Sequence, residues 1–143
     1  MLRRKSLPDS LRGPFAAFRA VVAPLERAKA AITQGVPSTR SPGRPLAEAL
    51  IEFEEGLRET RAGMQGWHVL EVEPEWLACD EALGEALALA ERLRLDAEPP
   101  AGFEGLVGTI GDLLAPLEAF EAAARRFGAL RRGGDRRRGG DRR

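Results

Sequence analysis

The sequence predicts an all-α protein, an antiparallel four-helix bundle. The clearest sign is a ladder of apolar residues near the C-terminus, whose alternating steps of three and four place them on one helical stripe. Three earlier segments carry similar stripes, and helices of this kind bury their stripes by packing on one another. The pattern fits a general architecture rather than a particular family. The ladder is Phe103, Leu106, Ile110, Leu113, Leu117, Phe120, Ala124 and Phe127.

The first helix is predicted from Pro14 to about residue 34. Gly13 is an acceptable N-cap, and Pro14 suits the first helical position, where its missing N–H costs nothing. Pro24 lies inside this segment and predicts a kink or break, because it removes a backbone hydrogen bond and clashes with the preceding turn. The expected buried stripe is Phe15, Phe18, Val22, Leu25 and Ile32.

A loop rich in proline and glycine follows over residues 35–45, and the second helix is predicted to end near Met64. On this helix Glu54 and Arg58 are spaced to form an ion pair. Its stripe is Leu46, Leu50, Phe53, Leu57, Thr60 and Met64. Residues 65–73 are then expected to run as an extended connector that lays Trp67 over the end of the bundle.

The third helix is predicted over 74–95, with an inward stripe of Trp76, Cys79, Leu83, Leu87, Ala90 and Leu93. After a turn at 96–100, the fourth helix continues to about Leu130. Glycines at every third position from Gly102 to Gly111 weaken its first half, and they indicate either close contact with another helix or looseness. Pro116 predicts a kink or break in this last helix.

Charge divides the chain into three parts. Residues 1–12 carry a net charge of +3 and are expected to be flexible, residues 13–130 form the bundle domain with a net charge of −8, and residues 131–143 carry +5. The last part is an Arg/Gly/Asp repeat without apolar residues, so it is expected to be disordered in isolation. Arginine supplies nearly all the basic residues, which indicates a bacterial genome of high GC content.

The single cysteine excludes an internal disulfide, and no stretch approaches the roughly 18 apolar residues of a membrane span. A basic N-terminal start without a following apolar run does not fit a signal peptide. We therefore expect a soluble, cytoplasmic protein.

No catalytic, metal or cofactor-binding constellation is visible, so we expect no cofactor and no enzymatic activity. The only histidine, His68, lies in a connector, whereas di-iron bundles need Glu-x-x-His on two helices. Residues Trp67, His68, Trp76 and Cys79 are nevertheless the candidates for a small-ligand or enzymatic pocket in the core. Cys79 is predicted to be structural, because free cysteine is among the most buried residue types.

Two clusters of basic residues are candidate anion sites. The loop before the second helix offers Arg40, Ser41 and Arg44 beside a helix N-terminus, which can hold a small anion. Nucleic-acid phosphates are the candidate ligands of the two basic ends, with contacts from Arg3, Arg4, Lys5, Arg136, Arg137 and Arg138. The tail lacks the interleaved aromatic residues that stack on bases.

These observations favour a small non-enzymatic helical-bundle protein that acts through protein–protein contact or self-association. The first alternative is association with nucleic acid through the basic ends. The second is a small-ligand-binding or enzymatic bundle with a core pocket. Heptad-like stripes serve both single-chain bundles and oligomers, so the sequence does not choose between a protein partner and a homo-oligomer.

Overall fold

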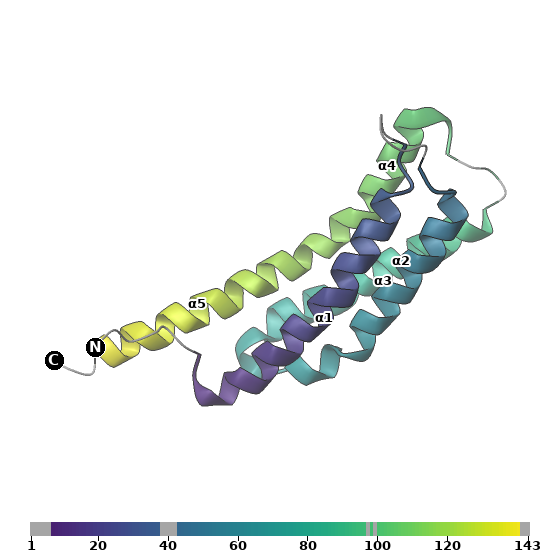
Figure 1. Ribbon diagram of the computed structural model, residues 1–143. Helices are drawn as coiled ribbons and strands as arrows, with labels where there is room; N and C mark the ends of the chain where they lie inside the picture. Colours follow the sequence, from purple (N-terminus) through teal and green to yellow (C-terminus); the bar gives the residue numbers. More distant parts are fainter. Residues whose placement is uncertain (1–6, 38–42, 97, 99, 141–143) are drawn as a thin grey trace.

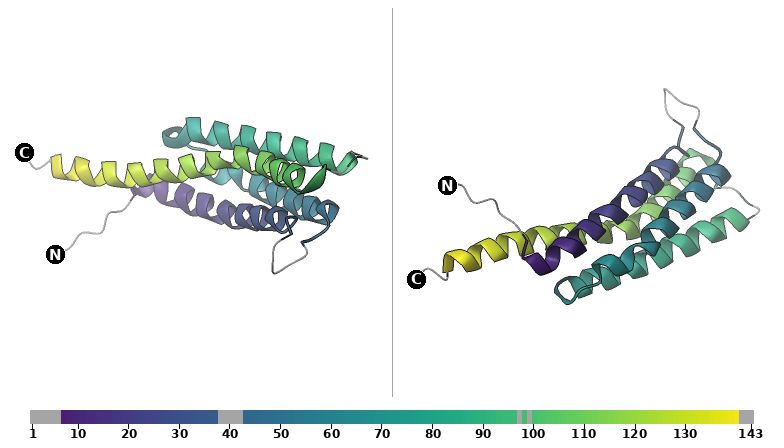
Figure 2. Two further views of the ribbon diagram at one scale, coloured as in Figure 1. Left: turned by 90° about the horizontal axis from the view of Figure 1, so that it is seen from above. Right: turned by 60° about the horizontal axis from the view of Figure 1, so that its bottom comes forward.

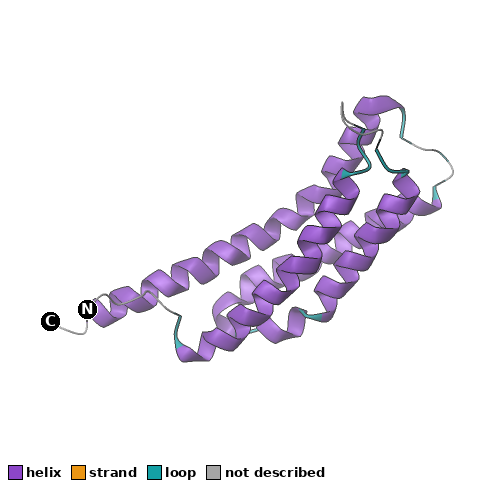
Figure 3. Ribbon diagram, in the orientation of Figure 1, coloured by secondary structure: helices purple, strands orange, loops and turns teal. Residues whose placement is uncertain are grey.

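A computed structural model describes the backbone of residues 7–37, 43–96, 98 and 100–140, and the side chains of these residues as far as Arg131. Within these residues the fold is all-α, and helices and connecting loops make up the whole described chain (Figure 3). Successive helical rods run in opposite directions (Figure 1). The predicted antiparallel four-helix bundle is therefore confirmed.

Among the residues that the structure describes, five α-helices and three short 3₁₀ turns build the four rods. The helices are α1 (Asp9–Thr33), α2 (Leu46–Ala62), α3 (Glu73–Leu95), α4 (Gly102–Leu114) and α5 (Ala119–Gly140). The turns are η1 (Met64–Trp67), η2 (Leu70–Val72) and η3 (Ala115–Glu118). The segments α4, η3 and α5 follow one another along a single curved rod (Figure 1). None of the described helices combines the length and apolar character needed to cross a bilayer.

The first helix begins earlier than predicted and continues through Pro24. Its first residue is Asp9, and Leu7 and Leu11 are buried, so the bundle includes residues from the segment expected to be flexible. The break expected at Pro24 is absent, since α1 is helical on both sides of it. Pro24 is itself buried, and its carbonyl oxygen faces Gly56 of α2. A kink there stays a prediction.

Close approach to α1 occurs at Gly56 of α2 and at Gly63, which lies between α2 and η1. A Cβ atom added at Gly56 would lie 2.7 Å from the Ala28 Cβ, and one at Gly63 would lie 2.5 Å from Val21 Cγ1. The glycines of α4 behave differently, because a Cβ at Gly108 or Gly111 would meet nothing within 4 Å. The close contact predicted for the Gly102–Gly111 segment is therefore wrong.

The middle connector was predicted to be extended, and this prediction is wrong. The connector forms the turns η1 and η2. Trp67 is nevertheless fully buried at the end of the bundle, as expected. The indole N–H of Trp76 donates a hydrogen bond of 2.8 Å to the Met64 carbonyl oxygen, which ties the turn to α3. Compact turns satisfy the polar backbone groups that an extended strand without a partner would leave bare.

The C-terminal ladder is confirmed in its middle and wrong at Phe103 and Ala124. Phe103 is 58% exposed and Ala124 is exposed, whereas the members from Ile110 to Phe120 and Phe127 are buried. Pro116 lies in η3, so the interruption takes the form of one 3₁₀ turn. The backbone of α5 continues to Gly140, past the end predicted near Leu130 and into the tail expected to be disordered.

Candidate partner groove between α1 and α5

The two outer rods of the bundle, α1 and α5, border a groove. Closest packing joins α1 to α2, and α5 packs on α3. Among the described residues, the backbones of α1 and α5 stay further apart than those of α1 and α2. Figure 2 shows α1 and α5 side by side and running in opposite directions. Large side chains must therefore fill the space between them.

Aromatic rings supply that filling. The Phe127 ring of α5 lies 5.3 Å from Phe15 and 5.2 Å from Phe18, both of α1, between ring centroids. Beneath them Trp67 meets Phe18 edge-on at 4.9 Å. Such tilted and edge-on pairs stabilise beyond the area they bury, by about 0.5–1.5 kcal/mol each. The floor of the groove, formed by Phe15 and Phe18, therefore rests on an aromatic cluster with Phe127 and Trp67.

Above this floor the groove encloses a cavity of about 550 Å³, within the range of about 300–1,000 Å³ usual for ligand sites. Its lining is apolar except for two arginines, and it includes no acidic residue. Ala23 and Ala124 are exposed, so the cavity is an open furrow on the surface. The lining residues are Phe15, Phe18, Arg19, Val22, Ala23, Ala124, Gly128 and Arg131.

Both arginines approach the same ring. The guanidinium carbon of Arg131 lies 5.2 Å from the centroid of Phe15, and that of Arg19 lies 5.9 Å from it. These are cation–π distances. The Nε atom of Arg131 is buried and has no hydrogen-bond partner among the described residues. The two guanidinium groups at this end of the groove suit an acidic group from outside, which would pair with their charge.

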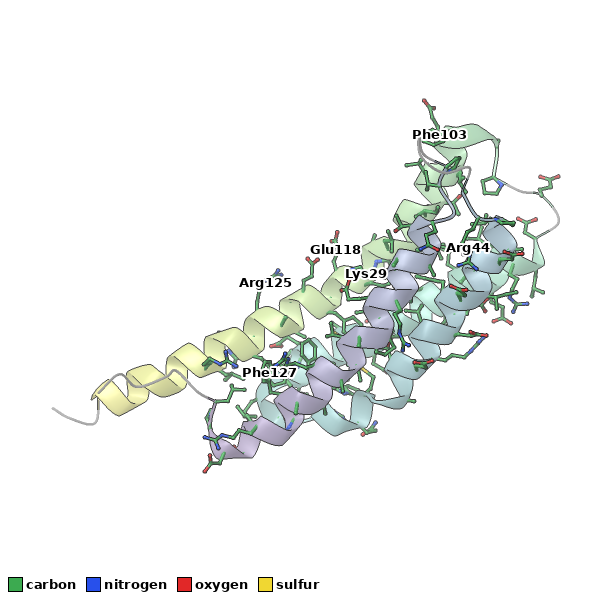
Figure 4. The ribbon with its side chains drawn as sticks, in the orientation of Figure 1. Lys29, Arg44, Phe103, Glu118, Arg125 and Phe127 are labelled. Atoms are coloured by element: carbon green, nitrogen blue, oxygen red, sulfur yellow. The ribbon has the colours of Figure 1, made fainter. Side chains whose placement is uncertain are left out.

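Neither of these arginines forms an ion pair with another described side chain. Most described basic side chains form an ion pair, such as Arg27 with Glu59 at 2.7 Å and Arg126 with Glu75 at 3.6 Å. Within the described side chains the arginines without an acidic partner are Arg19, Arg92, Arg125 and Arg131. Two of these four line the groove. Figure 4 shows Phe127 on the α1 side of α5 and Arg125 pointing away from α1.

The predicted core-pocket residues lie close together but are engaged in structural contacts. The His68 ring stacks on Trp76 at 3.7 Å, and its Nε2 lies 2.8 Å from a Glu73 carboxylate oxygen. Trp67 and Cys79 are fully buried in the hydrophobic core. Of these residues Trp67 alone belongs to the aromatic cluster beneath the groove.

The Cys79 thiol is expected to resist modification in the folded protein. Burial raises its pKa to about 12, and the Glu75 carboxylate adds to the rise. Because the thiolate is the reactive form, a raised pKa lowers its population at every pH below that value. At pH 8 we expect a disulfide reagent to label Cys79 at least about a hundredfold more slowly in native buffer than in denaturant. Equal labelling rates would contradict this placement.

The predicted anion site is only partly within the described residues. Arg44 forms two hydrogen bonds to the Glu52 carboxylate, at 2.8 and 2.9 Å. These bonds raise the pKa of Arg44 and lower that of Glu52. The Arg44 guanidinium is therefore already paired within the chain. Arg40 and Ser41 lie outside the described residues.

The predicted nucleic-acid contacts are not tested by the structure. Arg3, Arg4 and Lys5 fall outside the described residues, and the side chains of Arg136, Arg137 and Arg138 lie beyond the last described side chain. Association with nucleic acid through these segments stays a prediction.

Sequence reasoning missed a buried carboxylate on α2. Glu54 is only 2% exposed and accepts hydrogen bonds from Arg58 at 3.3 Å, as the spacing predicted, and from Arg94 of α3 at 2.8 Å. The bond to Glu54 raises the pKa of Arg94. A signal was present in the sequence, because Glu54 lies between Leu50, Phe53 and Leu57 on the apolar side of its helix. The bond between Glu54 and Arg94 joins α2 to α3.

Within the described part of the chain, no cluster of three or more histidine, cysteine, aspartate or glutamate side chains has the arrangement of a metal site. Comparison of the chain with protein-family models, curated proteins and solved structures gives no significant match.

Proposed function

We propose that this chain is a small non-enzymatic helical-bundle protein that acts through protein–protein contact, with the α1/α5 groove as its contact surface. The observation that carries the proposal is an open apolar furrow whose two arginines have no acidic partner in the described chain. Partner-binding surfaces combine a desolvated aromatic centre with arginine in this way.

A non-enzymatic role agrees with the state of the residues that the sequence offers for catalysis. Cys79 is buried with a raised pKa, which makes it a weak nucleophile. His68 is held by Glu73 and by stacking on Trp76. We place the protein in the cytoplasm, where a lone free thiol stays reduced.

Site-specific photo-cross-linking in the source cells tests the proposal. A benzophenone amino acid placed at Ala23, in the groove, should yield a discrete protein adduct. The matched probe at Glu81, on the exposed face of α3, should not yield that adduct. No adduct from Ala23, or the same adducts from both positions, would overturn the groove as the contact surface. The adduct mass separates self-association from another partner, since a second copy of the chain adds 15.5 kDa.

A further inference from the structure

We infer that the occupant of the α1/α5 groove is an acidic amphipathic helix of a partner protein. Its apolar side chains lie over the phenylalanine floor, and one of its carboxylates lies between Arg19 and Arg131. This inference rests on the proposed function and adds the chemistry of the partner.

Charge complementarity selects an acidic group. Two guanidinium groups lie within 6 Å of the Phe15 centroid, and the groove lining contributes no acid to balance them. Arg131 Nε is buried without an acceptor among the described residues. A carboxylate beside the two guanidinium groups would pair with their charge and reduce the repulsion between the two cations.

The charge of the rest of the bundle makes this attraction local. Residues 13–130 carry a net charge of −8 and repel an acidic peptide, whereas residues 131–143, which begin at the Arg131 end of the groove, carry +5 and attract it. Attraction by the bundle is therefore restricted to places where arginines lack acidic partners. The groove is such a place, and it also offers apolar surface for burial.

The shape of the groove favours a helix over an acyl chain. The furrow follows two antiparallel helices from Phe15 to Ala23, about 12 Å at 1.5 Å per residue, which is two turns of a partner helix. Ala23, Ala124 and Gly128 leave room for close backbone approach. An acyl chain in this open furrow would keep one side in water, whereas a helix covers the furrow with its own polar face.

The geometry gives a sequence pattern for the partner. Arg19 and Arg131 both lie at the Phe15 ring, whereas the small residues Ala23 and Ala124 lie further along the groove. A helix that fits both features carries an acidic residue with apolar residues four and seven positions away from it, on one face.

Fluorescence anisotropy with designed peptides tests this chemistry. The first probe is a labelled alanine-rich helical peptide that carries one Glu with Leu four and seven positions away, and the second is identical except for Gln in place of Glu. We expect the full-length protein to bind the Glu peptide about tenfold more tightly, equivalent to about 1.4 kcal/mol. This advantage should shrink at about 1 M salt, because screening weakens exposed charge pairs.

Arginine variants test whether the preference for the Glu peptide over the Gln peptide arises in the groove. Arg19→Gln and Arg131→Gln should each remove most of the Glu-over-Gln preference while leaving weak binding of both peptides. Arg125→Gln removes the same charge from α5 outside the groove and should leave the preference intact. Circular dichroism confirms that each variant is folded, and Arg19→Lys keeps the charge if Arg19→Gln unfolds. Equal loss in the Arg125 variant would overturn the assignment.

The remaining outcomes separate this inference from the proposed function. A groove adduct in cells together with equal binding of the Glu and Gln peptides would overturn the acidic helix and leave protein contact standing. Binding of laurate that depends on Arg19 and Arg131, with no binding of either peptide, would assign the groove to a lipid carboxylate. Tenfold preference without any adduct in cells would support the chemistry and contradict the proposed function.

Discussion

Replacing Gly56 with alanine is expected to lower the free energy of unfolding by about 2 kcal/mol, the usual cost of overpacking a well-packed contact. The added Cβ would lie 2.7 Å from the Ala28 Cβ and 2.9 Å from the Pro24 carbonyl oxygen. Both neighbours belong to α1 and include backbone, so no side-chain rotation can relieve the clash. The higher helix propensity of alanine, worth up to about 1 kcal/mol, offsets only part of the cost.

Gly108→Ala is the matched control for this prediction. The same change is made in a helix, but a Cβ at Gly108 would meet nothing within 4 Å. Only the propensity term remains there, so this variant should gain up to about 1 kcal/mol. Urea denaturation of the two variants gives both values. A Gly56 variant as stable as the wild type would show that α1 and α2 are not in close contact at this point.

The helical stripes could be predicted because they depend on spacing along the chain alone. Leu50, Phe53 and Leu57 are buried as the period of 3.6 requires, whatever neighbour covers them. The same reasoning places Leu113 and Leu117 in the core. It fails at Phe103, because that end of α4 extends past the helices that would cover it.

Features that depend on which helices are neighbours could not be predicted in this way. The run of glycines in α4 predicted close contact there, but the described glycines that lie closest to another helix are Gly56 in α2, Gly63 after its end and Gly66 in η1. Propensity is a property of one helix, whereas close approach is a property of two. The burial of Glu54 likewise depends on Arg94, forty residues away along the chain.

The α1/α5 groove is the clearest feature that depends on which helices are neighbours and that could not be predicted from the sequence. Phe15 and Phe18 were expected in a uniform core, and Arg19 and Arg131 carried no distinguishing signal in a chain rich in arginine. The groove lies on the side of α1 away from its closest neighbour, because α1 lies closer to α2 than to α5 and Gly56 permits that close approach. A surface feature thus follows from a packing feature on the other side of α1.

Replacing Trp67 with alanine is expected to lower the free energy of unfolding by about 3–5 kcal/mol, the range for deleting a large aromatic side chain from a core. Trp67 is fully buried, and its ring lies 4.9 Å from Phe18 and 6.2 Å from Phe127 between centroids. Its loss leaves a cavity beneath the groove. In urea denaturation, the Trp67→Ala variant should show a large fall in the midpoint concentration with little change in the m-value.

Trp67→Phe and Trp76→Phe separate the volume of the indole from its hydrogen bond. The Trp67 Nε1 atom is buried without a hydrogen-bond partner among the described residues, whereas Trp76 Nε1 donates to the Met64 carbonyl. Phenylalanine at position 67 removes a group whose burial is itself costly, while at position 76 it removes a satisfied bond worth about 1 kcal/mol. We therefore expect Trp67→Phe to retain most of the stability that Trp67→Ala loses. If Trp67→Phe lowers the free energy of unfolding as much as Trp67→Ala, the lost ring volume would not account for the result. The indole N–H of Trp67 must then have a hydrogen-bond partner.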